Sequence, residues 1–403
     1  MEPLSIETDY LVIGAGIIGL TLARELKQRY PQSRITVIEK EAQVACHGSG
    51  RNSGVLHAGF YYTADSLKAR FTRDGNRMMQ AYVDEKGLAI NRCHKLVVAT
   101  SEEQQQGIHE LKRRGDHNGV AVQIVDQHQA AAIDPNARTI GCALYSPTTA
   151  TVDPGQVCRQ LFNDLVALGV RFHFSHGYAA RIDDHTVRTR GGMTIAAQTI
   201  INAAGLYADR IAKDFGVGEQ YTIIPFKGIY LKYHGTNPPA RTNIYPVPNL
   251  KNPFLGVHYT VTVDGTVKIG PTAIPAFWRE NYGGLAHFSF RELSEIIGWE
   301  SRLYLEDAFG FRSLALDELR KYRRSHFVGL AASMVHQLDR DGFDQWSTPG
   351  IRAQLLDTTT RELVMDFVVK KGGASIHILN AVSPAFTCSM PFAAWVVETY
   401  LSS

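Results

Sequence analysis

The hydrophobic and polar positions at the start of the chain follow three patterns in turn. Residues 10–13 are an uninterrupted apolar run, which indicates a buried strand. Leu22, Ala23 and Leu26 then recur at helical spacing, and a second apolar run follows at 35–38. This order predicts a strand, a helix and a second strand, the unit from which parallel sheets are built.

Later segments also differ from one another in pattern. The spacing of apolar residues predicts a helix over 66–86. Residues 221–283 alternate in period two and are dense in Tyr, Pro and Val, which indicates a sheet. Residues 289–325 become helical and charged, and residues 326–403 form a last mixed portion that ends in a helix.

Segments typical of a nucleotide-binding sheet therefore stand at the beginning, in the middle and at the end of the chain. Its 403 residues are enough for two domains. We predict an α/β and α+β protein with a discontinuous boundary. The nucleotide-binding domain is expected over 1–88, 146–222 and 326–403, and a β-rich substrate domain over 89–145 and 223–325.

The turn after the first apolar run carries a glycine triplet, Gly14-x-Gly16-x-x-Gly19. The first glycine allows a tight turn, the second lets the backbone approach a pyrophosphate, and the third lets helix and strand pack closely. The helix N-terminus attracts phosphate. Glu39, which ends the second strand, can accept both hydroxyls of an adenosine ribose. Strand, turn, helix, strand and acid together predict an adenine dinucleotide.

Two further loops favour a flavin over a nicotinamide cofactor. A nicotinamide enzyme normally continues its parallel strands directly after the acid, whereas this chain inserts a loop rich in small polar residues at 46–62. A second glycine-rich segment follows at 370–384. A flavin stays bound through many turnovers, so enclosure by several segments suits it.

Composition excludes several function classes. The net charge of +3 is too small to indicate nucleic-acid binding. The five cysteines are scattered without a Cys-x-x-Cys pair, so neither a metal site nor a disulfide framework is indicated, and a reducing compartment fits. The N-terminus lacks a secretory pattern, and no run reaches the ~20 apolar residues that span a bilayer. We expect a cytoplasmic protein, with a peripheral contact on the inner face of a membrane left open.

Four blocks in the same order carry a family resemblance: 51–62, 224–230, 349–354 and 375–384. On these blocks the chain resembles the L-2-hydroxyglutarate dehydrogenases and oxidases of the FAD-dependent D-amino-acid oxidase superfamily. The resemblance implies a Rossmann-like FAD-binding domain of the glutathione-reductase type and a β-rich substrate domain. Relatives can attach flavin covalently through cysteine or histidine, but Cys388, beyond the Gly-Gly segment, gives no positive reason for it. We expect non-covalent FAD and leave covalent attachment as the alternative.

The implied reaction is oxidation of an L-2-hydroxy dicarboxylate to a 2-oxo acid, with FAD taking the hydride. The electron acceptor stays open between quinone, oxygen and another flavoprotein. Ile229 stands where the family often has an acidic residue, and Val382 replaces a frequent proline, so the exact acid is open. Two alternatives remain: a glycine- or sarcosine-oxidase-like enzyme of the same fold, and a non-catalytic flavoprotein subunit.

The resemblance also implies roles for individual residues. Arg352, in a Gly-x-Arg segment, is expected to grip the substrate α-carboxylate, because a guanidinium binds a carboxylate through two parallel hydrogen bonds. Two histidines compete as the base, since imidazole titrates near neutral pH: His57 and His377.

Further side chains are expected at the distal carboxylate and at the cofactor. For the distal carboxylate the candidates are Lys227, Tyr230, Tyr61 and Tyr245, with Arg312 further back. The residues expected to contact FAD are Gly14, Gly16, Ile17, Gly19, Glu39, Lys40, Ser49, Gly50, Arg51, Asn52, Ser53, Ala204, Gly205, Gly372, Gly373, Leu379 and Asn380.

Overall fold

The computed structural model describes residues 5–63, 66–248, 256–381 and 383–401. Val382 therefore lies outside the described residues. The chain divides into two compact units, each made of separate segments. Unit 1 comprises Met1–Asn52, Pro154–Pro225 and Arg352–Ser403, and unit 2 comprises Ser53–Asp153 and Phe226–Ile351.

Unit 1 is built on one large sheet whose central strand is β1 (Ser5–Ile13). Parallel partners lie on both sides of β1, namely β2 (Ile35–Ile38) and β12 (Thr194–Asn202). The nine-residue β12 pairs with an antiparallel strand over its first part and with the parallel β23 (Ser375–Asn380) over its last part. The sheet thus joins the beginning, the middle and the end of the chain.

The other strands of unit 1 lie toward the edges of this sheet or in a short hairpin. They are β9 (Arg171–His173), β10 (Tyr178–Arg181), β11 (Thr186–Thr189), β21 (Glu362–Leu363) and β22 (Val368–Gly372). Two strands carry the chain from one unit to the other: β13 (Tyr221–Gly228) and β20 (Gly350–Asp357).

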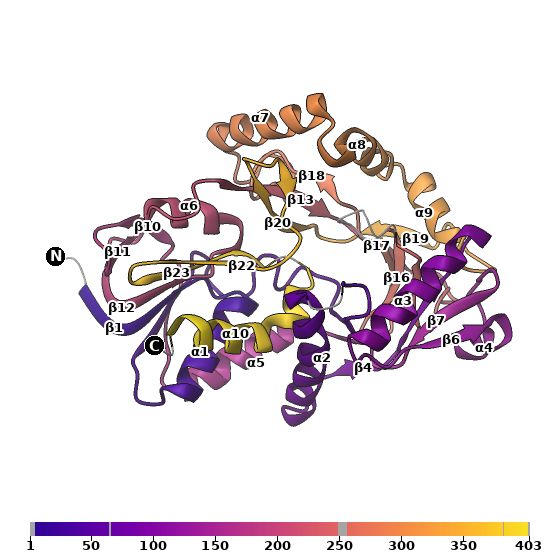
Figure 1. The fold of residues 1–403 in the computed structure, drawn as a ribbon, viewed down its shortest axis with the longest axis horizontal. Helices are drawn as coiled ribbons and strands as arrows, with labels where there is room; N and C mark the ends of the chain where they lie inside the picture. The colour runs from indigo at the N-terminus through magenta and orange to yellow at the C-terminus, as the bar shows by residue number, and fades with distance from the viewer. Residues whose placement is uncertain (1–4, 64–65, 249–255, 382, 402–403) are drawn as a thin grey trace. The chain divides into compact units, whose positions relative to one another are not determined.

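Helices cover one side of the unit 1 sheet. The helix α1 (Ile17–Arg29) packs against α5 (Pro154–Ala167) and α10 (Ala385–Leu401), and Figure 1 shows the three together. The short helices η2 (Gly205–Tyr207) and α6 (Ala208–Asp214) follow β12. Leu20, Leu22 and Leu26 of α1 are fully buried, as the helical spacing predicted.

Unit 2 contains three small sheets and the strand β18, which pairs with β13 in a four-stranded sheet of order β18-β13-β20-β21. Their strands are β3 (Val55–Leu56), β4 (Ile90–Asn91), β5 (Lys95–Val98), β6 (Gln123–Asp126), β7 (Cys142–Ser146), β8 (Ala150–Val152), β14 (Leu231–Tyr233), β15 (Asn243–Pro246), β16 (His258–Val261), β17 (Val267–Gly270), β18 (Ile274–Pro275) and β19 (Phe343–Trp346). The β-rich pattern of 221–283 is therefore borne out.

Some of the helices of unit 2 begin at side-chain caps and others do not. The helices are α2 (Leu67–Glu85), η1 (Glu102–Gln104), α3 (Gln105–His117), α4 (Gln127–Ile133), α7 (Phe290–Glu306), η3 (Ala308–Gly310), α8 (Phe311–Arg320) and α9 (Arg324–Ala332). The Oγ of Ser66 caps α2, and Asp126 forms a capping box with Gln129 on α4. No helix of the described residues is long and apolar enough to cross a membrane.

The segments group differently from the boundaries expected from sequence at four places. Two of the differences are short, since residues 146–153 belong to unit 2 and residues 223–225 to unit 1. The other two are longer. Residues 53–88 belong to unit 2, because β3 and β4 both pair with β8 in one three-stranded sheet. Residues 326–351 also belong to unit 2, because Phe327 and Val328 of α9 pack in its core against Tyr259. Pairing and packing over long sequence distances decide both groupings.

Candidate functional site

The turn that joins β1 to α1 is built on glycine. Gly14 has a φ of +107°, and a Cβ on it would lie 2.6 Å from the carbonyl oxygen of Ala203. A Cβ on Gly19 would lie 1.9 Å from the carbonyl oxygen of Gly14. Gly16 is the N-cap of α1, and the first turn of this helix carries no acidic residue. The turn is therefore a close backbone cradle at a helix N-terminus, which attracts phosphate.

The carboxylate of Glu39 is held at the end of β2 by backbone donors. Its Oε2 accepts a hydrogen bond from the Ala15 N–H at 2.8 Å, and its Oε1 accepts one from the Glu41 N–H at 3.0 Å. A carboxylate offers about four acceptor positions, so two remain for a ligand. Glu39 is thus fixed next to the glycine turn and still able to accept ribose hydroxyls.

The polar loop predicted after β2 folds against the start of α1. The Oγ of Ser49 accepts a hydrogen bond from the Ile17 N–H at 2.8 Å, and Asn52 Nδ2 donates to the Ser49 carbonyl at 2.7 Å. Arg51 Nε donates to the Cys46 carbonyl at 2.7 Å. A Cβ on Gly50 would lie 2.3 Å from a backbone oxygen. The structure therefore brings these loop residues together with the glycine turn.

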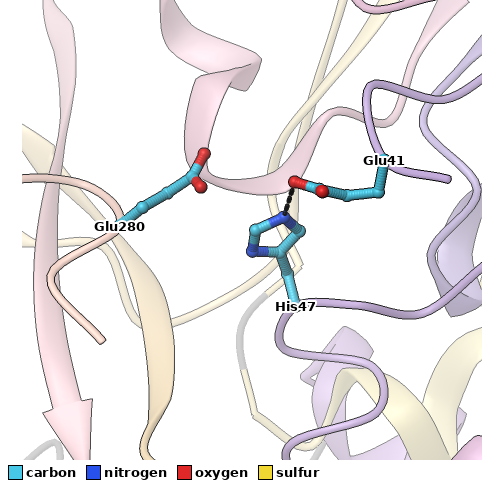
Figure 2. Close-up of side chains that lie close together, drawn as sticks. All are labelled: Glu41, His47 and Glu280. Atoms are coloured by element: carbon cyan, nitrogen blue, oxygen red, sulfur yellow. Dashed lines mark hydrogen bonds and ion pairs between the residues drawn. The ribbon is translucent and has the colours of Figure 1, made fainter. Parts of the chain in front are cut away.

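A small ionic cluster lies on the same loop. His47 Nε2 lies 2.8 Å from Glu41 Oε1, as Figure 2 shows, and the Lys40 ammonium group also donates to Glu41. Burial raises the pKa of Glu41, but the hydrogen bonds from Lys40 and His47 outweigh it and lower this pKa to about 2. Glu41 is therefore ionised at neutral pH and anchors Lys40, one of the predicted cofactor contacts.

The predicted C-terminal cofactor segment is a hairpin rather than a loop. Gly372 ends β22, Gly373 turns the chain with a φ of +57°, and Leu379 and Asn380 end β23. Asn380 Nδ2 donates to two backbone carbonyls at 3.0 and 2.7 Å, whereas its buried Oδ1 accepts no hydrogen bond from the described residues. Such an orphaned acceptor is normally satisfied by a ligand or by water.

Two further predicted contacts lie at the end of β12. Ala204 is the N-cap of η2, and Gly205, the first residue of η2, has a φ of +55°. The Ala204 N–H donates to Asn202 Oδ1 at 3.2 Å. Because β1 and β12 are parallel neighbours, Ala204 and Gly205 lie at the same sheet edge as the glycine turn.

His377 is buried within β23 and both of its ring nitrogens have protein partners. Its Nδ1 lies 3.1 Å from Asn202 Nδ2, and its Nε2 lies 2.8 Å from Ser375 Oγ. Burial lowers its pKa to about 4. The sequence places this histidine in a loop, but the structure places it in a strand as a neutral, fully bonded ring.

Arg352 lies on β20, half-buried, and is the first residue of the last segment of unit 1. Its neighbour Ile351 is buried. The strand fixes the backbone of this arginine, while its role at a carboxylate stays a prediction.

Unit 2 contains a buried group of five side chains, here called the amine–phenol cluster: His57, Tyr61, Lys95, Tyr245 and His258. Lys95 on β5 is fully buried, and its Nζ lies 3.9 Å from the ring centroid of Tyr245 and 5.3 Å from that of Tyr61. The same Nζ lies 3.5 Å from His57 Nδ1. The ring of His258 stacks on Tyr245 with centroids 3.7 Å apart.

Burial governs the electrostatics of the cluster. It lowers the pKa of Lys95 to about 7. Burial first, and then the charge of Lys95, lower the pKa of His57 well below its usual range. Burial also raises the pKa of both Tyr61 and Tyr245, so they stay neutral phenols. The hydroxyl of Tyr61 is buried and makes no hydrogen bond with the described residues, and such a group is normally satisfied by a ligand or by water.

The other predicted substrate residues in unit 2 surround this cluster or lie apart from it. The phenol of Tyr230 lies near enough to raise the pKa of Tyr245, and Lys268 Nζ lies 4.7 Å from the Tyr230 ring centroid. Lys227 Nζ donates to Asn281 Oδ1 at 3.1 Å, and burial lowers its pKa. Tyr230 thus lies close to the amine–phenol cluster without being one of its five members, whereas the Lys227 ammonium group is bound to Asn281.

Two predicted residues of unit 2 have local structural partners. Ser53 Oγ accepts a hydrogen bond from the Val55 N–H at 3.3 Å. Arg312 Nε donates to the Tyr304 carbonyl at 2.7 Å, and its Nη2 donates to the Leu305 carbonyl at 2.5 Å. Arg312 therefore satisfies carbonyls at the C-terminal end of α7, as a cation there does in many helices.

Sequence analysis missed Lys95 and His258. A signal for Lys95 was present, since it is the one charged residue in the strand 95–98, all of whose residues are buried. A lysine at such a position is rare unless it has a function. His258 carried no such signal, because only the stacking on Tyr245 places it in the cluster.

Comparison with known proteins places the whole chain in one family. The family model described as FAD dependent oxidoreductase (DAO) matches residues 9–399. The L-2-hydroxyglutarate dehydrogenase of Escherichia coli K12 is 34% identical over 418 residues, covering 98% of this chain and 94% of the relative. The human mitochondrial L-2-hydroxyglutarate dehydrogenase is 32% identical, covering 97% and 88%.

Solved structures of lower identity share the fold. L-α-glycerophosphate oxidase from Mycoplasma pneumoniae, solved with FAD bound, has a TM-score of 0.75 at 19% identity, covering 98% of this chain and 95% of that one. Glycine oxidase from Geobacillus kaustophilus has a TM-score of 0.70 at 17% identity, covering 98% and 94%. At these identities the likeness shows the fold alone.

Proposed function

The chain belongs to the FAD dependent oxidoreductase family, and we propose that it oxidises L-2-hydroxyglutarate, or a similar 2-hydroxy acid, to 2-oxoglutarate or the corresponding 2-oxo acid. One observation carries the substrate assignment: identity above 30% along nearly the full length of bacterial and human L-2-hydroxyglutarate dehydrogenases. The glycine oxidases of Geobacillus kaustophilus and Bacillus cereus are 17% and 14% identical to this chain, so they support the alternative substrate class only weakly.

The residues of unit 1 fit FAD. The glycine turn offers backbone N–H groups to a pyrophosphate, and Glu39 retains acceptor positions for ribose hydroxyls. The buried Oδ1 of Asn380 has no hydrogen-bond donor among the described residues and can accept one from the cofactor. We therefore assign the cofactor to unit 1. Of the proposed substrate-side groups, Arg352 belongs to unit 1, and His57, Tyr61 and Tyr245 belong to unit 2. When bound, FAD accepts the hydride that leaves C2 of the substrate.

The roles of the side chains follow from their chemistry. Arg352 grips the α-carboxylate through two parallel hydrogen bonds and so sets the orientation of C2. His57 removes the hydroxyl proton, and we prefer it to His377 because both nitrogens of His377 are held by Asn202 and Ser375. The buried hydroxyl of Tyr61, which has no partner among the described residues, and the hydroxyl of Tyr245 donate to the distal carboxylate.

Anaerobic mixing tests this function. L-2-hydroxyglutarate is expected to bleach the flavin absorbance of the purified holoenzyme within one turnover, with 2-oxoglutarate formed in equal amount. Glycine, sarcosine and D-2-hydroxyglutarate serve as controls. Bleaching by an amino acid together with none by L-2-hydroxyglutarate would contradict the proposal in favour of the amine-oxidase alternative. A protein that no 2-hydroxy or amino acid bleaches would be the non-catalytic flavoprotein.

We further propose that electrons leave at the surface of an anionic membrane, where a quinone is the acceptor. The support is a set of exposed apolar side chains on α7 and α8, the helices labelled at the top of Figure 1. Phe290 and Leu305 are 74% and 73% exposed, and Arg320 and Arg323 are exposed nearby. The wild type is expected to sediment with phosphatidylglycerol vesicles and the double variant F290S/L305S to stay in solution. A wild type that does not sediment contradicts this part.

A further inference from the structure

Lys95 is a buried amine without an acid partner. It is fully buried on β5, and among the residues that the structure describes no carboxylate contributes to its electrostatic surroundings. A buried lysine is almost always paired with an acid, because an isolated buried charge is costly. The Nζ of Lys95 lies 3.5 Å from Nδ1 of His57. This contact calls for a functional explanation.

We propose that Lys95 is the positioning residue of His57, and that its amine takes over the proton that His57 removes from the substrate hydroxyl. The inference rests on the proposed function, in which His57 is the base. As the substrate O–H bond breaks, its proton binds Nε2 of His57. The proton on Nδ1 then passes to the lone pair of Lys95 Nζ. The O–H electron pair forms the carbonyl while C2 loses its hydride to the flavin.

The hydrogen-bond direction between the two groups decides whether His57 can act. A charged Lys95 donates to Nδ1, which leaves the hydrogen of the neutral ring on Nε2 and makes Nε2 a donor. A neutral Lys95 accepts from the Nδ1 hydrogen, which leaves Nε2 as an acceptor able to take a proton. Activity therefore requires the deprotonated amine.

The surroundings favour this state near neutral pH. Lys95 faces the rings of Tyr61 and Tyr245, the thiol of Cys93 and the ring of His57, and His258 also faces His57. Burial raises the pKa of both phenols and of the Cys93 thiol and lowers the pKa of His57, so these four groups are neutral at pH 7. Burial lowers the pKa of Lys95 to about 7 and that of His57 further below its usual range. The amine is thus the stronger base of the pair, and the proton ends on it.

A pair of substitutions tests the relay through the pH dependence of kcat/KM on L-2-hydroxyglutarate. For the wild type we expect kcat/KM to rise with pH through one step near 7, where Lys95 deprotonates. Lys95→Met has a similar length but no amine, so we expect a 10- to 100-fold lower value without that step between pH 6 and 9. Lys95→Arg keeps a permanent charge and is expected to be low at every pH.

Matched controls separate the relay from a merely structural role. Lys86→Met removes a lysine that lies over the ring of Tyr82, with Nζ 5.8 Å from its centroid, and is expected to leave the pH profile unchanged. Flavin content and thermal unfolding are measured for all variants. A folded Lys95→Met that keeps the step near pH 7 would overturn the relay. So would a Lys95→Arg variant with wild-type activity.

A second readout needs neither substrate nor a variant at Lys95. The ¹⁵N shifts of His57, assigned with His57→Gln, report which ring nitrogen carries the hydrogen. We expect the hydrogen to move from Nε2 to Nδ1 as pH rises from 6 to 9, and an unchanged tautomer would overturn the proposal. If the wild type oxidises no 2-hydroxy acid, the proposed function fails, whereas this titration still tests the pairing of Lys95 with His57.

Discussion

At the residue scale, the proposed cofactor site depends on a few positions where the residue type is fixed by close contacts with the backbone. Gly14 is one, because its positive φ and the 2.6 Å approach of the Ala203 oxygen leave no room for a Cβ. Glu39 is another, since two backbone N–H groups fix its carboxylate beside the turn. In each case the residue type predicted from sequence has a physical reason that the structure supplies.

Gly14→Ala is expected to lower bound FAD at least fivefold, because the added methyl group displaces the turn that faces the pyrophosphate. The ratio of flavin absorbance to protein absorbance measures this. Gly87→Ala is the matched control, since Gly87 also has a positive φ, of +63°, but nothing lies within 4 Å of its Cβ position. Full flavin content in Gly14→Ala would show that the turn is not the cofactor site.

Arg352→Met is expected to raise KM for the substrate by about 30- to 1000-fold, since losing one partner of a charged pair costs roughly 2–4 kcal/mol. Steady-state kinetics measures the change, with flavin content as the check on folding. Arg188→Met, which removes an exposed arginine of β11, is the control. A KM within twofold of the wild type would remove Arg352 from the substrate site.

At the scale of elements, short-range hydrogen bonds determine where helices begin and tertiary pairing determines how strands assemble. The helix α2 begins where Ser66 caps it, close to the predicted start at residue 66. The strands β3 and β8 pair although the matched residues Leu56 and Ala150 are 94 positions apart in the chain. Helix boundaries were therefore predictable from sequence, whereas the grouping of residues 53–88 with unit 2 was not.

Ser66→Ala is expected to lower the free energy of unfolding by about 1 kcal/mol, because the Ala69 N–H loses the side-chain acceptor now at 3.1 Å. Urea unfolding followed by circular dichroism measures this loss. Ser66→Asp retains an acceptor and is expected to lose less than half as much. Equal losses in both variants would mean that the cap does not stabilise α2.

At the scale of the whole molecule, buried titratable groups link stability to pH. His377 is the clearest case, since burial lowers its pKa to about 4 while an unfolded histidine titrates near 6.5. Between these values the unfolded chain binds more protons than the folded one. Stability is therefore greatest above about pH 6.5 and falls as pH decreases toward 4.

The contribution of His377 to this loss is expected to reach about 3 kcal/mol, from a pKa difference of roughly 2.5 at 1.36 kcal/mol per unit. Unfolding free energies measured from pH 4 to 8 test it. His377→Gln has no titrating ring, so its stability is expected to change less over this range. His109→Gln, on α3, serves as the control. An identical pH dependence in His377→Gln and the wild type would contradict the assignment.

The sequence by itself determined the glycine turn, the acid after β2, the helix starts and the family, because these depend on local spacing and on the ordered blocks of residues. Tertiary structure alone decided the grouping of segments into two units, the bonded state of His377 and the amine–phenol cluster. Lys95 and Tyr245 are 150 residues apart in the chain, and only the parallel pairing of β5 with β15 brings their strands together. Burial then shifts their pKa values, and burial is a property of the fold rather than of any local pattern.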